Sequence, residues 1–98
     1  MERAGGTMTV MLDGRPVLVT SLARLSDLEF AAGMLSARLP LRGGGWVRLP
    51  GIGPKELIAV FLDGDRLAPQ YDAGDALLAL PDRPRSGRLV ALFGGAPP

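Results

Sequence analysis

The side chains that could do chemistry in this 98-residue sequence are carboxylates, hydroxyls, arginines and one lysine, Lys55, because cysteine and histidine are absent. Without those two residue types the chain has no disulfide, no thiolate nucleophile, no imidazole base and no ordinary zinc or haem site. We therefore predict no metal and no cofactor. Asp72 and Asp75 could form a pair of catalytic carboxylates, but acids beside Gly74 are typical of a turn, so we predict no catalysis there.

Between residues 46 and 95 the sequence alternates apolar runs with short turn motifs. The run Leu57–Leu62 leads into Gly64-Asp65-Arg66-Leu67-Ala68-Pro69, and Gly74-Asp75 and Ser86-Gly87 each precede another apolar run. These ordered blocks resemble the self-cleaving domain of the LexA and phage-repressor family, in which a hydrophobic strand precedes a Gly-Asp-Ser-Met-x-Pro turn and further Gly-Asp-apolar strands follow. The resemblance implies a small β-rich fold related to a serine–lysine peptidase, and it implies dimerisation, because family members commonly dimerise through this domain.

The residues that carry peptidase activity in that family are not matched. Arg66 occupies the position of the nucleophilic serine, and no lysine matches the family's general base, since Lys55 lies upstream of the motif. A guanidinium with a pKa above about 12 can act neither as a nucleophile nor as a base at neutral pH. We therefore predict that the chain is not an enzyme and has no catalytic residues.

The same turn supplies the candidate binding residues, which are Gly64, Asp65, Arg66, Leu67 and Pro69. One hypothesis is that Asp65 and Arg66 line a cleft and that the guanidinium holds a carboxylate or phosphate of a partner by bidentate contact. The alternative is that Arg66 is a solvated turn residue. The predicted function is a non-enzymatic interaction or regulatory module, acting through a homodimer or another protein partner.

The first forty residues predict a hairpin and a helix. In Met8–Thr20 an Asp13-Gly14 pair separates two β-branched runs, which indicates a β-hairpin. From Ser26 a capping box begins a predicted amphipathic helix, which ends before Pro40. Its apolar stripe is formed by Leu28, Ala31, Ala32, Leu35 and Leu39.

Four later segments are predicted strands: Trp46–Leu49, Leu57–Leu62, Ala76–Leu80 and Leu89–Phe93. Leu57–Leu62 is apolar throughout and is predicted to be the central strand, buried on both faces. The motif Val-x-Leu-Asp-Gly occurs at residues 10–14 and 60–64, which we attribute to a common turn pair rather than to a duplicated unit.

We predict one domain, 1–98, that is mainly β (α+β). The glycines at 43–45 separate a hairpin and helix, 1–42, from the LexA-like β segment, 46–95. A β-grasp fold is the alternative, since a hairpin, a helix and a near-terminal Gly94-Gly95 fit a sulfur carrier. A small virion or tail protein is a third possibility.

Composition restricts the partners. A net charge of +1 gives too weak a field to attract nucleic acid, so direct nucleic-acid binding is not expected. No apolar run approaches the roughly 20 residues that cross a bilayer, and the first residues do not form a signal peptide. We therefore predict a cytoplasmic protein without membrane contact.

Overall fold

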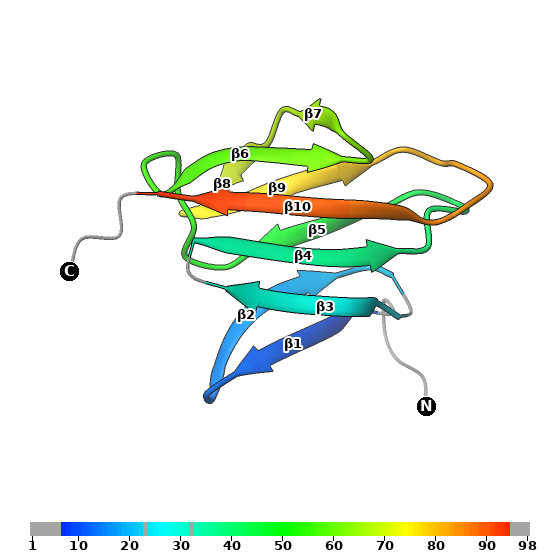
Figure 1. Cartoon of the computed structure of the whole chain (residues 1–98). Helices are drawn as coiled ribbons and strands as arrows, with labels where there is room; N and C mark the ends of the chain where they lie inside the picture. Colours follow the sequence, from blue (N-terminus) through cyan, green and yellow to red (C-terminus); the bar gives the residue numbers. More distant parts are fainter. Residues whose placement is uncertain (1–6, 23, 32, 95–98) are drawn as a thin grey trace.

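Antiparallel strands build the fold in the computed structural model, which describes residues 7–22, 24–31 and 33–94 (Figure 1). The strands are β1 (Met8–Leu12), β2 (Arg15–Thr20), β3 (Ser26–Ala31), β4 (Met34–Leu39), β5 (Gly45–Leu49), β6 (Leu57–Leu62), β7 (Asp65–Leu67), β8 (Gln70–Asp72), β9 (Asp75–Leu80) and β10 (Gly87–Phe93). Sheet A has the order β1-β2-β5-β9-β8, and sheet B has the order β3-β4-β10-β6-β7. The prediction of a mainly β protein is confirmed.

The chain alternates between the two sheets as it proceeds. Hairpins β1–β2 and β8–β9 flank the single strand β5 in sheet A, and hairpins β3–β4 and β6–β7 flank β10 in sheet B. Positive φ angles at both central residues mark the turns Asp13-Gly14, Asp63-Gly64 and Ala73-Gly74. This is the φ pattern of a type I′ turn, whose twist matches that of the strands. The predicted hairpin in Met8–Thr20 is confirmed.

One hydrophobic core lies between the two sheets, because alternate residues of each strand point inward. In β9 the inward residues are Ala76, Leu78 and Leu80, and in β10 they are Leu89 and Ala91. The residues between them face outward. The two outer faces of the sheets are therefore the large surfaces on which function could reside.

The helix predicted from Ser26 to Leu39 is wrong, because this segment forms β3 and β4. Its apolar spacing also fits a period of two, with Leu35, Ala37 and Leu39 in the core. Gly33 lies between the strands at a φ of 77°, and its carbonyl accepts a 2.8 Å hydrogen bond from the Phe93 amide. Pairing with β10 therefore overrides local helix propensity. A β-grasp fold, which needs a helix across its sheet, is not the arrangement in the described ranges, and Gly95 lies outside them.

The central strand of sheet B is β10, whereas the predicted central strand, Leu57–Leu62, is β6 and lies between β10 and β7. It is also not buried on both faces, since Ile58 is 59% exposed. The other predicted strands are confirmed within β5, β9 and β10.

Residues 43–45 join β4 of sheet B to β5 of sheet A. Strands from both sides of this segment pair with each other, β2 with β5 and β4 with β10. No helix in the part of the chain that the structure describes is long and apolar enough to cross a membrane.

Candidate interaction surface

The candidate residues of the Gly-Asp-Arg-Leu turn lie on hairpin β6–β7. Asp65 pairs with Leu62, Arg66 with Phe61 and Leu67 with Val60. Since paired residues share a face of the sheet, Arg66 points outward beside Phe61, whereas Leu67 packs against the core.

The other two candidates lie away from Arg66 on the surface. Gly64 occupies the tip of the turn at a φ of 86°, and Pro69 lies where the chain passes from β7 of sheet B to β8 of sheet A. The five residues therefore do not share one face of the sheet. Arg66 is the one whose exposed side chain joins a larger surface.

Tertiary hydrogen bonds hold this hairpin to the start of β10. The Asp63 amide donates to the Arg88 carbonyl at 2.9 Å, and the Arg88 amide donates to Asp63 Oδ1 at 3.0 Å. Arg83 adds contacts to Asp63 Oδ2 at 3.4 Å and to Asp65 Oδ2 at 4.0 Å. The position of Arg66 is consequently fixed by its strand pairing and by a turn tied to the next strand.

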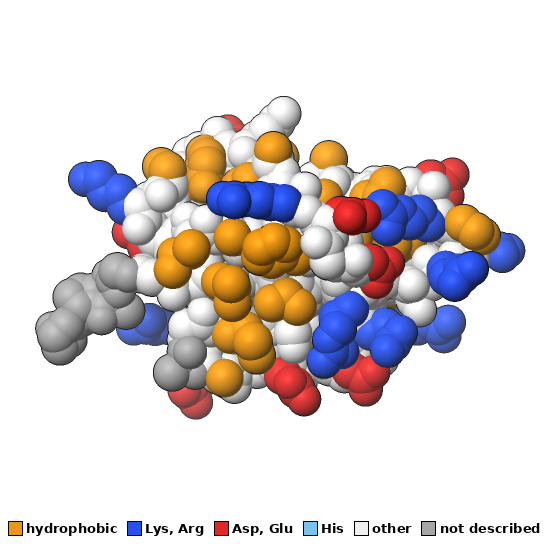
Figure 2. Space-filling model, turned by 45° about the horizontal axis from the view of Figure 1, so that its top comes forward, with side chains coloured by type: hydrophobic (Ala, Val, Ile, Leu, Met, Phe, Trp, Pro, Cys, Tyr) orange, Lys and Arg blue, Asp and Glu red, His pale blue; other side chains and the backbone are white. Residues whose placement is uncertain are grey.

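The outer face of sheet B carries an apolar patch. Figure 2 shows hydrophobic side chains gathered in the middle of this face, with Lys and Arg side chains grouped toward its right-hand end. The patch consists of Met34, Ile58, Ala59, Phe61, Val90 and Leu92, which lie on three adjacent strands. This surface was not among the predictions from the sequence. Its signal was present, because outward positions of β6 and β10 are apolar where a solvated face would be polar.

A transverse row crosses all five strands through the middle of this patch. In strand order it consists of Glu29, Ser36, Val90, Phe61 and Arg66, each paired directly with the next. Glu29 at the β3 edge and Arg66 at the β7 edge are exposed, and neither makes a side-chain hydrogen bond or ion pair within the described ranges. The patch is thus bordered by an acid on one edge and a cation on the other.

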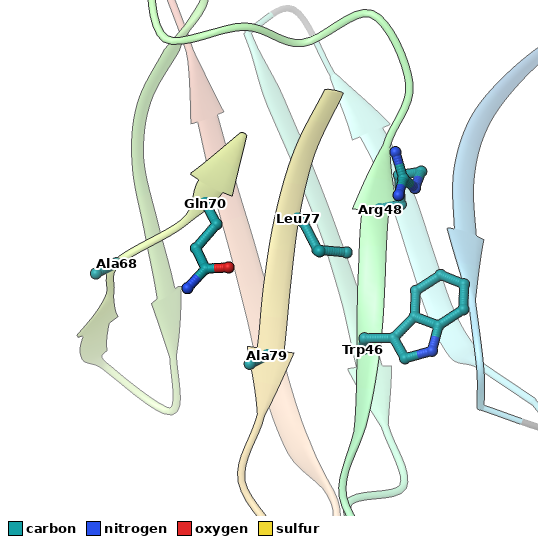
Figure 3. Close-up of a pocket in the computed structure, with 6 residues that line it drawn as sticks. All are labelled: Trp46, Arg48, Ala68, Gln70, Leu77 and Ala79. Atoms are coloured by element: carbon teal, nitrogen blue, oxygen red, sulfur yellow. The ribbon is translucent and has the colours of Figure 1, made fainter. Parts of the chain in front are cut away.

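The outer face of sheet A is different. It has a shallow hollow of about 260 Å³, lined by Trp46, Arg48, Ala68, Gln70, Leu77 and Ala79 (Figure 3). Ala68 and Ala79 leave space beneath its rim because their side chains are small. The hollow lies over β9, between Gln70 on β8 and Trp46 on β5.

The cation beside this hollow is already neutralised. Arg48 donates to Asp72 Oδ2 and Asp75 Oδ2 at 3.0 Å each, and these bonds raise the pKa of Arg48. A hydrogen bond from the Gly51 amide and a second from Arg48 lower the pKa of Asp75. This is the pair of carboxylates considered for catalysis, and in the structure both bind Arg48. No three acidic side chains in the described part of the chain come together as a metal site.

In the described ranges the fold consists of two antiparallel sheets, and apolar side chains lie on the outer faces of both. Comparisons of the chain with protein-family models, with curated proteins and with solved structures found no match. The resemblance to the LexA family therefore stays a prediction from residues 46–95.

Proposed function

We propose that this chain is a non-enzymatic interaction module that forms a homodimer through the outer face of sheet B. The observation that carries the proposal is the apolar patch with opposite charges at its two edges that form no ion pair within the described ranges. An apolar sheet face exposed on a small protein is typical of an interaction site. The resemblance to LexA-like domains supports association, and Arg66 in place of serine supports a role without self-cleavage.

A second copy is the occupant that best fits the charges of this face. Two copies can pack face to face around a two-fold axis that runs parallel to β10, the central strand. This operation lays β3 of one copy over β7 of the other, so Glu29 faces Arg66 twice, once on each side of the axis. Val90 and Leu92 then pack near their own copies, as expected for an isologous interface.

The same two-fold rotation also determines which charged side chains meet at the end of the interface where β10 begins. It brings Arg88 near its own copy, which is unfavourable. Packed sheets are rotated by about 30° relative to each other, so this end lies toward the rim. Counter-ions reduce the repulsion there.

The expected dimer is weak. Strands of about 20 Å, spaced about 4.8 Å apart, give a face of roughly 400–500 Å². Two such faces bury on the order of 1,000 Å², the lower limit for a specific interface. We therefore expect a dissociation constant in the micromolar range.

A charge-swap experiment tests this geometry without disturbing the core. Sedimentation velocity over a range of protein concentrations compares the wild type with Glu29→Arg, with Arg66→Glu and with the double variant. Each single reversal creates two repulsive pairs per dimer and should weaken association about tenfold or more. The double variant restores opposite charges and should recover most of the wild-type association.

Arg15→Glu is the matched control, because Arg15 is an exposed arginine on β2 of sheet A and is not part of the row on the outer face of sheet B. It should leave association unchanged. A wild type that stays monomeric at high micromolar concentration, or a double variant no better than either single one, contradicts the proposed interface.

A further inference from the structure

We propose that a second hollow, at the arginine-rich end of sheet B, binds a phosphate group. This arginine hollow has a volume of about 300 Å³ and is lined by Arg24, Leu25, Ser26, Arg38, Pro40 and Ser86. It lies where the start of β3, the end of β4 and the β9–β10 loop meet. Figure 2 shows Lys and Arg side chains grouped toward this end of the face.

The positive charge of the arginine hollow is incompletely balanced. Within the described ranges, Arg38 makes one ion pair, from Nε to Asp27 Oδ2 at 3.3 Å, and both side chains are well exposed. Arg24 makes no ion pair in the same ranges. An exposed pair of this kind contributes little and leaves the terminal guanidinium nitrogens of Arg38 available.

The strand register adds an independent sign of a missing anion. Arg38 on β4 lies directly opposite Arg88 on β10, on the same outer face. Like charges directly opposite each other on antiparallel strands are destabilising. A bound anion would relieve this repulsion, and the arginine hollow lies beside Arg38.

The donors match a tetrahedral oxyanion such as phosphate better than a carboxylate. Two guanidinium groups offer paired N–H donors that fit phosphate oxygens, and the Ser26 and Ser86 hydroxyls can donate to the oxygens that remain. A carboxylate has only two oxygens and would leave some of these donors unused. A continuous nucleic-acid track is disfavoured because Asp27, Asp63 and Asp82 interrupt the positive surface at this end.

The phosphate group that binds the arginine hollow could belong to free inorganic phosphate or to a phosphorylated side chain, and a titration distinguishes the two. Inorganic phosphate and O-phosphoserine are added to ¹⁵N-labelled protein at constant ionic strength, and amide shifts are followed by NMR. We expect saturable shifts centred on Ser26, Arg38 and Ser86. Tighter binding of O-phosphoserine assigns the site to a phosphorylated protein, and tighter or equal binding of inorganic phosphate assigns it to the free anion.

Arg24→Gln and Arg38→Gln should each weaken binding about tenfold or more, since each removes charge-assisted hydrogen bonds. Arg15→Gln, which removes the same charge far from the hollow, should not. Arg66→Glu, which should weaken the proposed dimer, should still bind phosphate. The phosphate proposal and the dimer proposal can therefore fail independently of each other. Shifts that do not saturate, or equal binding by Arg24→Gln and Arg15→Gln, would overturn the proposal.

Discussion

Replacing Asp63 by alanine tests how much the tie between hairpin β6–β7 and β10 contributes to stability. The molecule supplies its own control, because Asp13 and Asp63 occupy the same Val-x-Leu-Asp-Gly motif and both have a φ of 53°. Alanine is strained at positive φ by about 1 kcal/mol relative to aspartate. This term is common to Asp13→Ala and Asp63→Ala and cancels in their difference.

The remaining difference comes from tertiary contacts that only Asp63 makes in the described structure. Its Oδ1 accepts the Arg88 amide at 3.0 Å, and its Oδ2 lies 3.4 Å from Arg83. A hydrogen bond to a charged acceptor contributes about 1–2 kcal/mol at this partly exposed position. The Arg83 pair, with side chains 36% and 43% exposed, adds at most about 0.5 kcal/mol.

We therefore expect Asp63→Ala to lose about 1–2.5 kcal/mol more unfolding free energy than Asp13→Ala. Urea unfolding followed by circular dichroism measures both values, and unchanged m-values would show that the denatured states are comparable. Asp63→Asn tolerates the same φ and can still accept the Arg88 amide, so it should lose less than Asp63→Ala. If the two alanine variants agree within about 0.5 kcal/mol, the tie to β10 has been overestimated.

Two further predictions concern the β8–β9 hairpin and its surroundings. Ala73 has a φ of 54° in the turn before Gly74. Because asparagine tolerates this conformation better than alanine, Ala73→Asn should raise the unfolding free energy by about 0.5–1 kcal/mol. An unchanged urea midpoint would refute this prediction. The Gly51 amide and Arg48 lower the pKa of Asp75 in the folded protein below its ordinary value near 3.8. The stability that Asp75 contributes is therefore fully present above that ordinary pKa. It is lost as the pH falls through the lowered pKa of the folded state. Asp75→Asn should accordingly lose less stability than the wild type between pH 7 and pH 3, and equal losses would contradict this origin.

The sequence was sufficient where local signals and tertiary pairing agree. The Asp13-Gly14 pair predicted a hairpin because a turn with two positive φ angles favours those residues regardless of what packs around it. Leu89–Phe93 was recognised as a strand because a short apolar run bounded by turn residues suits a buried one. Both predictions depended on neighbouring residues alone.

The helix prediction failed because the same apolar residues fit both the helical period of 3.6 and the strand period of two. Leu28, Leu35 and Leu39 are compatible with a helical stripe, but Leu35 and Leu39 also fit the inward face of a strand. Gly33, at a positive φ of 77°, lies where one strand ends and the next begins. The choice between the two structures was made by pairing with β10, about fifty residues later in the chain, which no local pattern reveals.

The candidate site was predicted only in part for a related reason. Arg66 was singled out as a departure from a resembling family, but its surroundings follow from the strand register that places Phe61, Val90 and Glu29 in one row. Register is a tertiary property, because a shift by one residue would turn Arg66 inward and Leu67 outward. The motif therefore identified the residue, and the sheet identifies the surface to which it belongs.

The contrast between the two outer faces is the strongest argument for assigning interaction to sheet B. On sheet A the arginine is satisfied within the chain, since Arg48 binds two carboxylates at 3.0 Å. On sheet B, Glu29 and Arg66 make no such contacts in the described ranges, although they lie on one row and flank apolar side chains. Each could be satisfied by its opposite on a second copy. A face that leaves complementary charges and apolar area to be completed from outside is what an isologous interface requires.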